Sequence, residues 1–183
     1  MPFMIFFVAT LALASQLDAN EHFLEDNPEL GTYQNIEQCF SGEVTLYMMF
    51  RNFEEDRFFG GTSKCVSATQ KTAVVRDSVR TSVGYGKTKV PRRLTFHSSA
   101  GYTMKNVARE QLLDEPTESF NLTGVYIDCE NCHIVRHSYV DEGAGCSYWV
   151  PEDKVTEENS CCHFVFDLLC GTHKYQVYDD CLQ

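Results

Sequence analysis

The chain has 183 residues, and its 26 acidic and 15 basic side chains give a net charge of −11. This acidic balance argues against nucleic acid and anionic membranes as partners, because both repel negative charge. It would favour the approach of small cations, although solubility explains it equally well. The length suffices for one domain with its own hydrophobic core.

Residues 1–14 predict a signal peptide. They contain no charged side chain and run almost continuously apolar from Phe3 to Ala14, which is typical of a secretory signal. Because a membrane-spanning helix needs roughly 20 residues, we expect cleavage after Ala14, or as late as Ala19, and an exported domain over residues 20–183. The sequon Asn121-Leu122-Thr123 predicts a glycosylated, exposed Asn121, in agreement with export.

In chain order, Asn27-Pro28-Glu29 predicts the start of a short helix over residues 28–40. Eight short β-type runs separated by turn residues follow, over residues 44–51, 64–70, 73–85, 93–98, 102–109, 121–129, 133–139 and 146–150. A helix is predicted after Glu157, and Gly171 suits its C-terminal end. This order predicts a mainly β fold, a closed antiparallel barrel with the late helix packed outside, wide enough to hold one small ligand.

One predicted strand directs a carboxylate toward the interior. In residues 73–85 one alternating set is polar and carries two arginines, so we expect the other set inside, namely Val75, Asp77, Val79, Thr81, Val83 and Tyr85. A buried carboxylate needs a partner. For Asp77 we expect a hydrogen bond, a protein cation such as Arg92 or Arg93 on a neighbouring strand, or a cationic ligand.

Several motifs spread over most of the chain match one family. They are Tyr47 to Asp56 with Phe58-Phe59-Gly60-Gly61 and Lys64-Cys65-Val66, then Cys132-His133-Ile134, Cys146-Ser147-Tyr148-Trp149, Phe164 to Gly171, and Tyr175-Gln176-Val177-Tyr178 with Cys181. As a set they resemble the tick histamine-binding proteins, which are salivary lipocalins. The resemblance implies a secreted, monomeric lipocalin-type barrel that sequesters a small host mediator to evade host defence. It implies no enzyme activity.

The resemblance also implies a cargo, for which we predict a biogenic amine, histamine or serotonin. In the amine binders both cysteine motifs carry an acid, and here His133 and Ser147 stand in those places. A related branch of the family binds leukotrienes or fatty acids, and some of that branch bind complement. A lipid mediator and a protein target are therefore the alternatives.

The candidate ligand-binding residues combine the resemblance with strand alternation. Asp56, Phe59 and Trp149 match pocket positions of the family, and a desolvated ammonium needs such a carboxylate or aromatic ring. The remaining candidates are Phe53, Asp77 and Ser147, the last of which shares a strand face with Trp149.

Seven of the nine cysteines lie between Cys129 and Cys181, and in an exported chain they are expected to form disulfides. The resemblance implies the pairs Cys65–Cys181 and Cys132–Cys162, with Cys39–Cys161 and Cys146–Cys170 as additions. Cys129 is then the odd thiol. The string from Cys129 to His133 has haem-attachment spacing, but oxidised cysteines bind neither haem nor metal, so we predict no cofactor and no metal site.

Overall fold

The computed structural model describes residues 23–182, so the predicted signal peptide and its cleavage site lie outside the described range. In chain order the elements are η1 (Pro28–Tyr33), η2 (Glu37–Phe40), β1 (Thr45–Arg51), β2 (Ser67–Gln70), β3 (Ser78–Tyr85), β4 (Thr88–His97), β5 (Val107–Leu112), β6 (Ser119–Asp128), β7 (Cys132–His137), η3 (Asp141–Gly143), β8 (Gly145–Pro151), η4 (Glu152–Lys154), α1 (Ser160–Cys170) and β9 (Tyr175–Gln176). The segment predicted as one helix over 28–40 forms the two short 3-10 helices η1 and η2.

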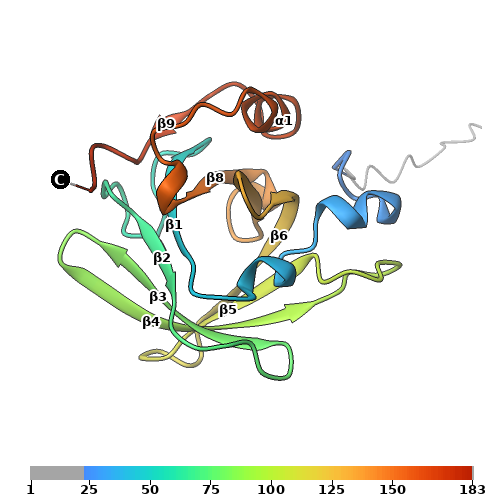
Figure 1. The fold of residues 1–183 in the computed structure, drawn as a ribbon, viewed down its shortest axis with the longest axis horizontal. Coiled ribbons are helices and arrows are strands. Elements are labelled where there is room, and N and C mark those ends of the chain that lie inside the picture. The colour runs from blue at the N-terminus through green and yellow to red at the C-terminus, as the bar shows by residue number, and fades with distance from the viewer. Residues whose placement is uncertain (1–22, 183) are drawn as a thin grey trace, which may run out of the picture.

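Eight antiparallel strands close into a barrel (Figure 1). They are paired in the order β2-β3-β4-β5-β6-β7-β8-β1, and β1 pairs with β2 to complete the ring. The short strand β9 adds to β1 near Phe50 and Arg51. The predicted mainly β fold, an eight-stranded lipocalin-type barrel, is therefore confirmed.

The helix α1 packs on the outside of the barrel wall (Figure 1), as predicted. Its N-terminus is capped by Asn159, whose side chain accepts a hydrogen bond from the Cys162 backbone, and Gly171 follows its last residue with φ +86°. Phe166 is fully buried against the ring of Phe50. Within the described residues no helix is long and apolar enough to cross a membrane.

Two groups of buried apolar side chains hold the fold. One fills the space between α1 and the outer wall and contains Phe50, Ile134, Tyr148 and Phe166. The other fills the barrel and contains, among others, Met48, Phe59, Val66, Val83, Phe96 and Trp149. Because strand side chains alternate between the two faces, Tyr148 and Trp149 belong to different groups although they are adjacent. The second group also surrounds a cavity inside the barrel.

Candidate functional site

A cavity of about 60 Å³ lies inside the barrel. Its lining is mainly aliphatic and aromatic, and includes Phe40, Leu46, Phe59, Leu94, Leu122 and Trp149. Four polar side chains interrupt this lining, namely Gln70, Thr81, Glu110 and His133. This volume is small beside the roughly 300–1,000 Å³ of pockets that hold drug-sized ligands. A lipid-sized ligand therefore requires lining side chains to move.

The loop after β1 carries Asp56 and two phenylalanines into the barrel. The Asp56 Oδ1 atom accepts hydrogen bonds from the backbone N–H groups of Phe58 and Phe59, at 3.0 and 3.2 Å. The loop reverses at Gly60, whose φ is +81°, and a Cβ atom there would lie 2.6 Å from the ring of Tyr85. Only glycine meets both conditions, which explains why this loop folds back with Phe59 against the cavity.

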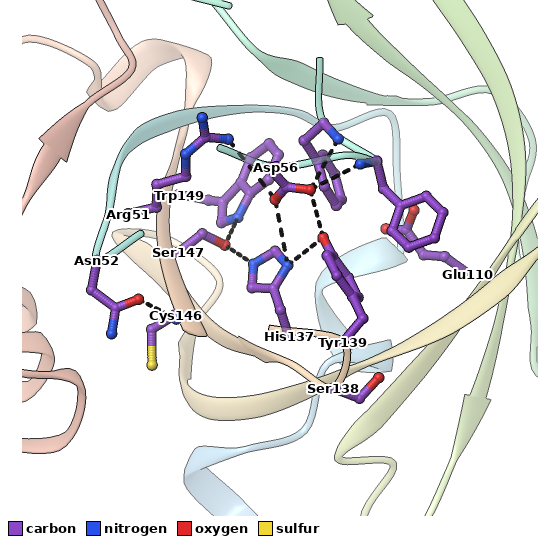
Figure 2. Close-up of polar contacts among 12 residues, drawn as sticks. Arg51, Asn52, Asp56, Glu110, His137, Ser138, Tyr139, Cys146, Ser147 and Trp149 are labelled. Atoms are coloured by element: carbon purple, nitrogen blue, oxygen red, sulfur yellow. Dashed lines mark hydrogen bonds and ion pairs between the residues drawn. The ribbon is translucent and has the colours of Figure 1, made fainter. Parts of the chain in front are cut away.

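Asp56 anchors a chain of polar side chains that ends at Trp149 (Figure 2). The Tyr139 hydroxyl donates to Asp56 Oδ1 at 2.8 Å, and the His137 Nδ1 atom lies 2.8 Å from the same hydroxyl. The other ring nitrogen of His137 lies 2.6 Å from Ser147 Oγ, and the Trp149 Nε1–H donates to that oxygen at 2.7 Å. The chain holds the Trp149 indole at a fixed position in the cavity wall.

The hydrogens in this chain have one consistent arrangement. The Tyr139 hydroxyl gives its hydrogen to Asp56, so the Nδ1 atom of His137 must carry the hydrogen that it shares with Tyr139. Burial lowers the pKa of His137 to about 4, opposed by Asp56 and reinforced by Arg51 and Arg92, so the ring is neutral at pH 7. Its Nε2 atom then accepts from the Ser147 hydroxyl, which in turn accepts from Trp149.

Both carboxylates inside the barrel have arginine partners. Glu110 on β5 forms an ion pair with Arg92 on β4, and both side chains are buried. Asp56 lies 3.9 Å from Arg51, which is also buried. Burial raises the pKa of Glu110, against the opposing effect of Arg92. Within the described residues Glu110 accepts a hydrogen bond from Arg92, whereas Asp56 Oδ2 makes none. The only carboxylate in the cavity lining, Glu110, is therefore already engaged.

His133 contributes a neutral ring to the cavity. It lies on β7 beside Trp149, its partner in the β7–β8 ladder, and it is 3% exposed. Burial lowers its pKa to about 4, with Asp128 opposing the shift. Its Nε2 atom makes no hydrogen bond within the described residues. Across residues 23–182, no group of three or more His, Cys, Asp or Glu side chains is placed to hold a metal ion.

Five of the six predicted site residues lie in the cavity lining or in the side chains directly behind it. Phe59 and Trp149 line the cavity. Asp56 and Ser147 lie behind this lining, in the chain that holds Trp149. Phe53 is half-buried and packs edge-on against His137, with ring centres 5.2 Å apart. Contact of these five residues with a ligand remains a prediction.

The expected inward orientation of Asp77 is wrong. Its side chain is 52% exposed and lies 3.4 Å from the Lys105 ammonium. The strand predicted over residues 73–85 begins only at Ser78, because Arg76 and Asp77 have φ of +51° and +58° and form a turn. From Val79 onward the predicted alternation holds. Neither Arg92 nor Arg93 is the partner of Asp77.

None of the four polar residues of the cavity lining was among the predicted site residues, although Thr81 was expected to face inward. Glu110 lies one residue beyond the strand predicted over 102–109 and continues the inward set of Ala108. Gln70 ends β2 and faces inward. His133 stood out as a departure from the family motif but was not assigned to the site. Extending the alternation by one residue would have found Glu110, whereas Gln70 already lay inside the strand predicted over 64–70.

The structure contains four disulfides, Cys39–Cys129, Cys65–Cys181, Cys132–Cys162 and Cys146–Cys170. The last three agree with the expected pairs. The pair Cys39–Cys161 is wrong, and Cys129 is not the odd thiol, because Cys39 in η2 lies beside the end of β6. Adjacent helix residues point about 100° apart, so once Cys162 faces the barrel, Cys161 is left exposed and free.

Asn121 lies on β6, and its side chain is exposed on the outer face of the barrel. An exposed side chain is the requirement that the sequon places on this position. Glycosylation of Asn121 itself remains a prediction.

Asp56→Asn is expected to lower the free energy of unfolding by about 2 kcal/mol, because the variant weakens charge-assisted hydrogen bonds at a buried carboxylate. Chemical denaturation measures the change. The matched control is Asp77→Asn, where an exposed ion pair is worth less than about 0.5 kcal/mol. Equal effects of the two substitutions would contradict the positions of the two carboxylates.

Comparisons with known proteins identify a matching family and a similar solved structure. The family model described as tick histamine binding protein matches residues 24–183. Among solved structures, Japanin from Rhipicephalus appendiculatus bound to cholesterol is similar, with a TM-score of 0.56 and 14% sequence identity over 77% of this chain and 96% of that chain. At this identity the likeness shows the fold alone. No curated protein sequence matches. On the family match, the chain belongs to the tick histamine-binding protein family.

Proposed function

We propose that this protein binds and sequesters a small, mainly apolar mediator of lipid type in the barrel cavity. The observation that carries the proposal is the cavity itself. Its wall is largely apolar, and its one carboxylate, Glu110, is already paired with Arg92. An apolar pocket with a few placed polar groups is the usual form of a small-molecule site. The similar protein Japanin was solved with cholesterol, which supports an apolar ligand.

A biogenic amine is the second candidate, and the presence of Glu110 in the lining favours it. An ammonium would have to draw Glu110 away from Arg92, leaving the buried guanidinium without a carboxylate. Leaving one charge of a buried pair uncompensated costs about 3–5 kcal/mol. The amine predicted from the family resemblance is therefore less favoured than the lipid alternative.

Binding is also favoured over catalysis. The order Asp56, His137 and Ser147 is reminiscent of a hydrolase triad, but Tyr139 lies between the carboxylate and the imidazole. Ser147 is fully buried, and its hydroxyl is engaged by both His137 and Trp149. We assign the network to positioning of Trp149, with no chemical step.

We also propose that the protein is exported and acts outside the cell, on a mediator of the host. The four disulfides support an oxidising environment, and the predicted signal peptide supplies the route. Glycosylation at Asn121 and a monomeric state belong to the same proposal.

Titration of the purified protein with lipids and amines tests the proposed function. Trp149 is the only tryptophan, so its fluorescence should change when arachidonic acid or cholesterol enters the cavity, with no change for histamine or serotonin. Ala108→Leu, which fills the cavity, should weaken lipid binding at least about 10-fold, since a well-packed interior resists added methylene groups. Ala73→Leu, at an exposed position, is the control. A change of Trp149 fluorescence with amines alone would reverse the proposed preference for a lipid over an amine.

A further inference from the structure

Two cavity side chains on neighbouring strands carry polar atoms without a partner in the described part of the chain. Oε1 of Gln70 and Oγ1 of Thr81 are buried and make no hydrogen bond. The two residues are 7% and 5% exposed, and they are directly opposite each other in the β2–β3 ladder. Such pairs point to one face with Cβ atoms about 5 Å apart. The two oxygens therefore form one polar patch on an apolar wall.

Donor counting fixes the orientation of the Gln70 amide. Its Nε2 atom donates to the backbone carbonyls of Phe40 and Thr72, at 3.2 and 2.8 Å. A flipped amide would place Oε1 against two other acceptors. Gln70 therefore presents only an acceptor oxygen to the cavity, and the ligand atom that meets it must be a donor.

This requirement separates the classes of ligand. A carboxylate has no hydrogen to donate. An ammonium can donate, but its charge would be desolvated without a free carboxylate, since Glu110 is held by Arg92. A hydroxyl is uncharged, donates to Gln70 and accepts from Thr81. Among these three groups, it alone satisfies both oxygens without burying an uncompensated charge.

A third unpartnered group lies across the cavity. His133 is on β7, which lies on the opposite side of the ring from β3, because three strands lie between them in either direction. Since the neutral ring can donate or accept through Nε2, His133 does not narrow the ligand class. It offers a polar contact to the far end of a ligand held at Thr81.

We propose that Gln70 and Thr81 form a hydroxyl-recognition subsite, so that the ligand is a mainly apolar molecule carrying a hydroxyl group. The inference rests on the proposed binding function of the cavity and names the chemistry of its ligand. Ordered water is the other possible occupant of these oxygens. A cavity that holds only water there would not distinguish a hydroxyl from an ether.

The test compares 1-decanol with its isomer 1-methoxynonane, which has the same atoms but no donor hydrogen. Titration monitored by Trp149 fluorescence should give 1-decanol a Kd about 5- to 10-fold lower, as expected for one net hydrogen bond. Equal Kd values would overturn the subsite. If all four compounds, the two isomers, arachidonic acid and cholesterol, fail to bind, the proposed function is contradicted. If the lipids bind and the isomers bind equally, only the subsite fails.

Two variants assign the effect to the two oxygens. Gln70→Met removes the acceptor and should abolish the preference for 1-decanol. Thr81→Val keeps the side-chain shape. It should raise the Kd of both isomers about 3- to 10-fold while preserving the ratio of the two Kd values. Thr95→Val, the same change at a half-buried position of β4 outside the cavity lining, is the control. An unchanged Kd in Thr81→Val would overturn the proposal even if Gln70→Met does not fold.

Discussion

Lowering the pH from 7 to 4.5 is expected to remove about 5 kcal/mol of stability through His133 and His137. Burial lowers the pKa of each imidazole to about 4, whereas the unfolded value is about 6.5. Between these values the unfolded chain binds more protons than the folded chain, so stability falls as the pH falls. Each histidine accounts for about half of the loss.

The measurement is the free energy of unfolding by denaturant at the two pH values, in wild type and in His133→Gln. Because Glu110 acts in the opposite direction, through a pKa raised by burial, the informative quantity is the difference between variants. His133→Gln should reduce the loss by about 2 kcal/mol. His97→Gln, at an exposed position on β4, should leave it unchanged. A loss of equal size in all three proteins would mean that His133 is not buried as a neutral ring.

Glu110→Gln is expected to lower the free energy of unfolding by about 3–5 kcal/mol at pH 7. The substitution leaves the guanidinium of Arg92 buried without its carboxylate, and the cost comes from the uncompensated charge. Arg92 is fully buried, with its guanidinium 4.5 Å from the centre of the Phe59 ring. The same variant should therefore disturb a residue that lines the cavity.

A double variant separates the net contribution of the ion pair to the free energy of unfolding from the loss caused by removing only one of its charges. Arg92→Met combined with Glu110→Leu replaces both charges with apolar side chains, and such replacements of buried pairs are often neutral or stabilising. We expect the double variant to recover most of the loss in a denaturant titration, and Glu118→Gln, at an exposed acid, to cause none. If the double variant is as unstable as Glu110→Gln, the loss comes from packing and not from charge.

The candidate site was only partly predictable from the sequence. Phe59 and Trp149 could be found because each lies in a motif with a recognisable neighbourhood. Asp77 was misplaced because alternation was extended through a turn, where two consecutive residues with positive φ break the period of two. The arginine partners of Asp56 and Glu110 could not be foreseen. They come from separate positions that only strand pairing brings together.

The cysteines illustrate the same limit. The spacing of cysteines does not specify which of them pair. The prediction paired Cys161 and left Cys129 free, and the structure reverses these roles because of the direction in which one helix residue points. Cys162 faces the wall and reaches Cys132, while its neighbour Cys161 faces solvent. The backbone position of η2 beside the end of β6 then selects Cys129 as the partner of Cys39.

By itself, the sequence determined the class of fold, because the period of two in the strands, the turn residues between them and the late helix are local properties of the chain. It also determined the family, through motifs that span most of its length. Only the tertiary structure decided the character of the cavity. Ion pairing, pKa values and unpartnered polar atoms such as Gln70 Oε1 depend on which distant side chains meet in a water-poor interior. Of the two carboxylates expected to hold a cation, Asp56 lies 3.9 Å from Arg51 and Asp77 is exposed beside Lys105.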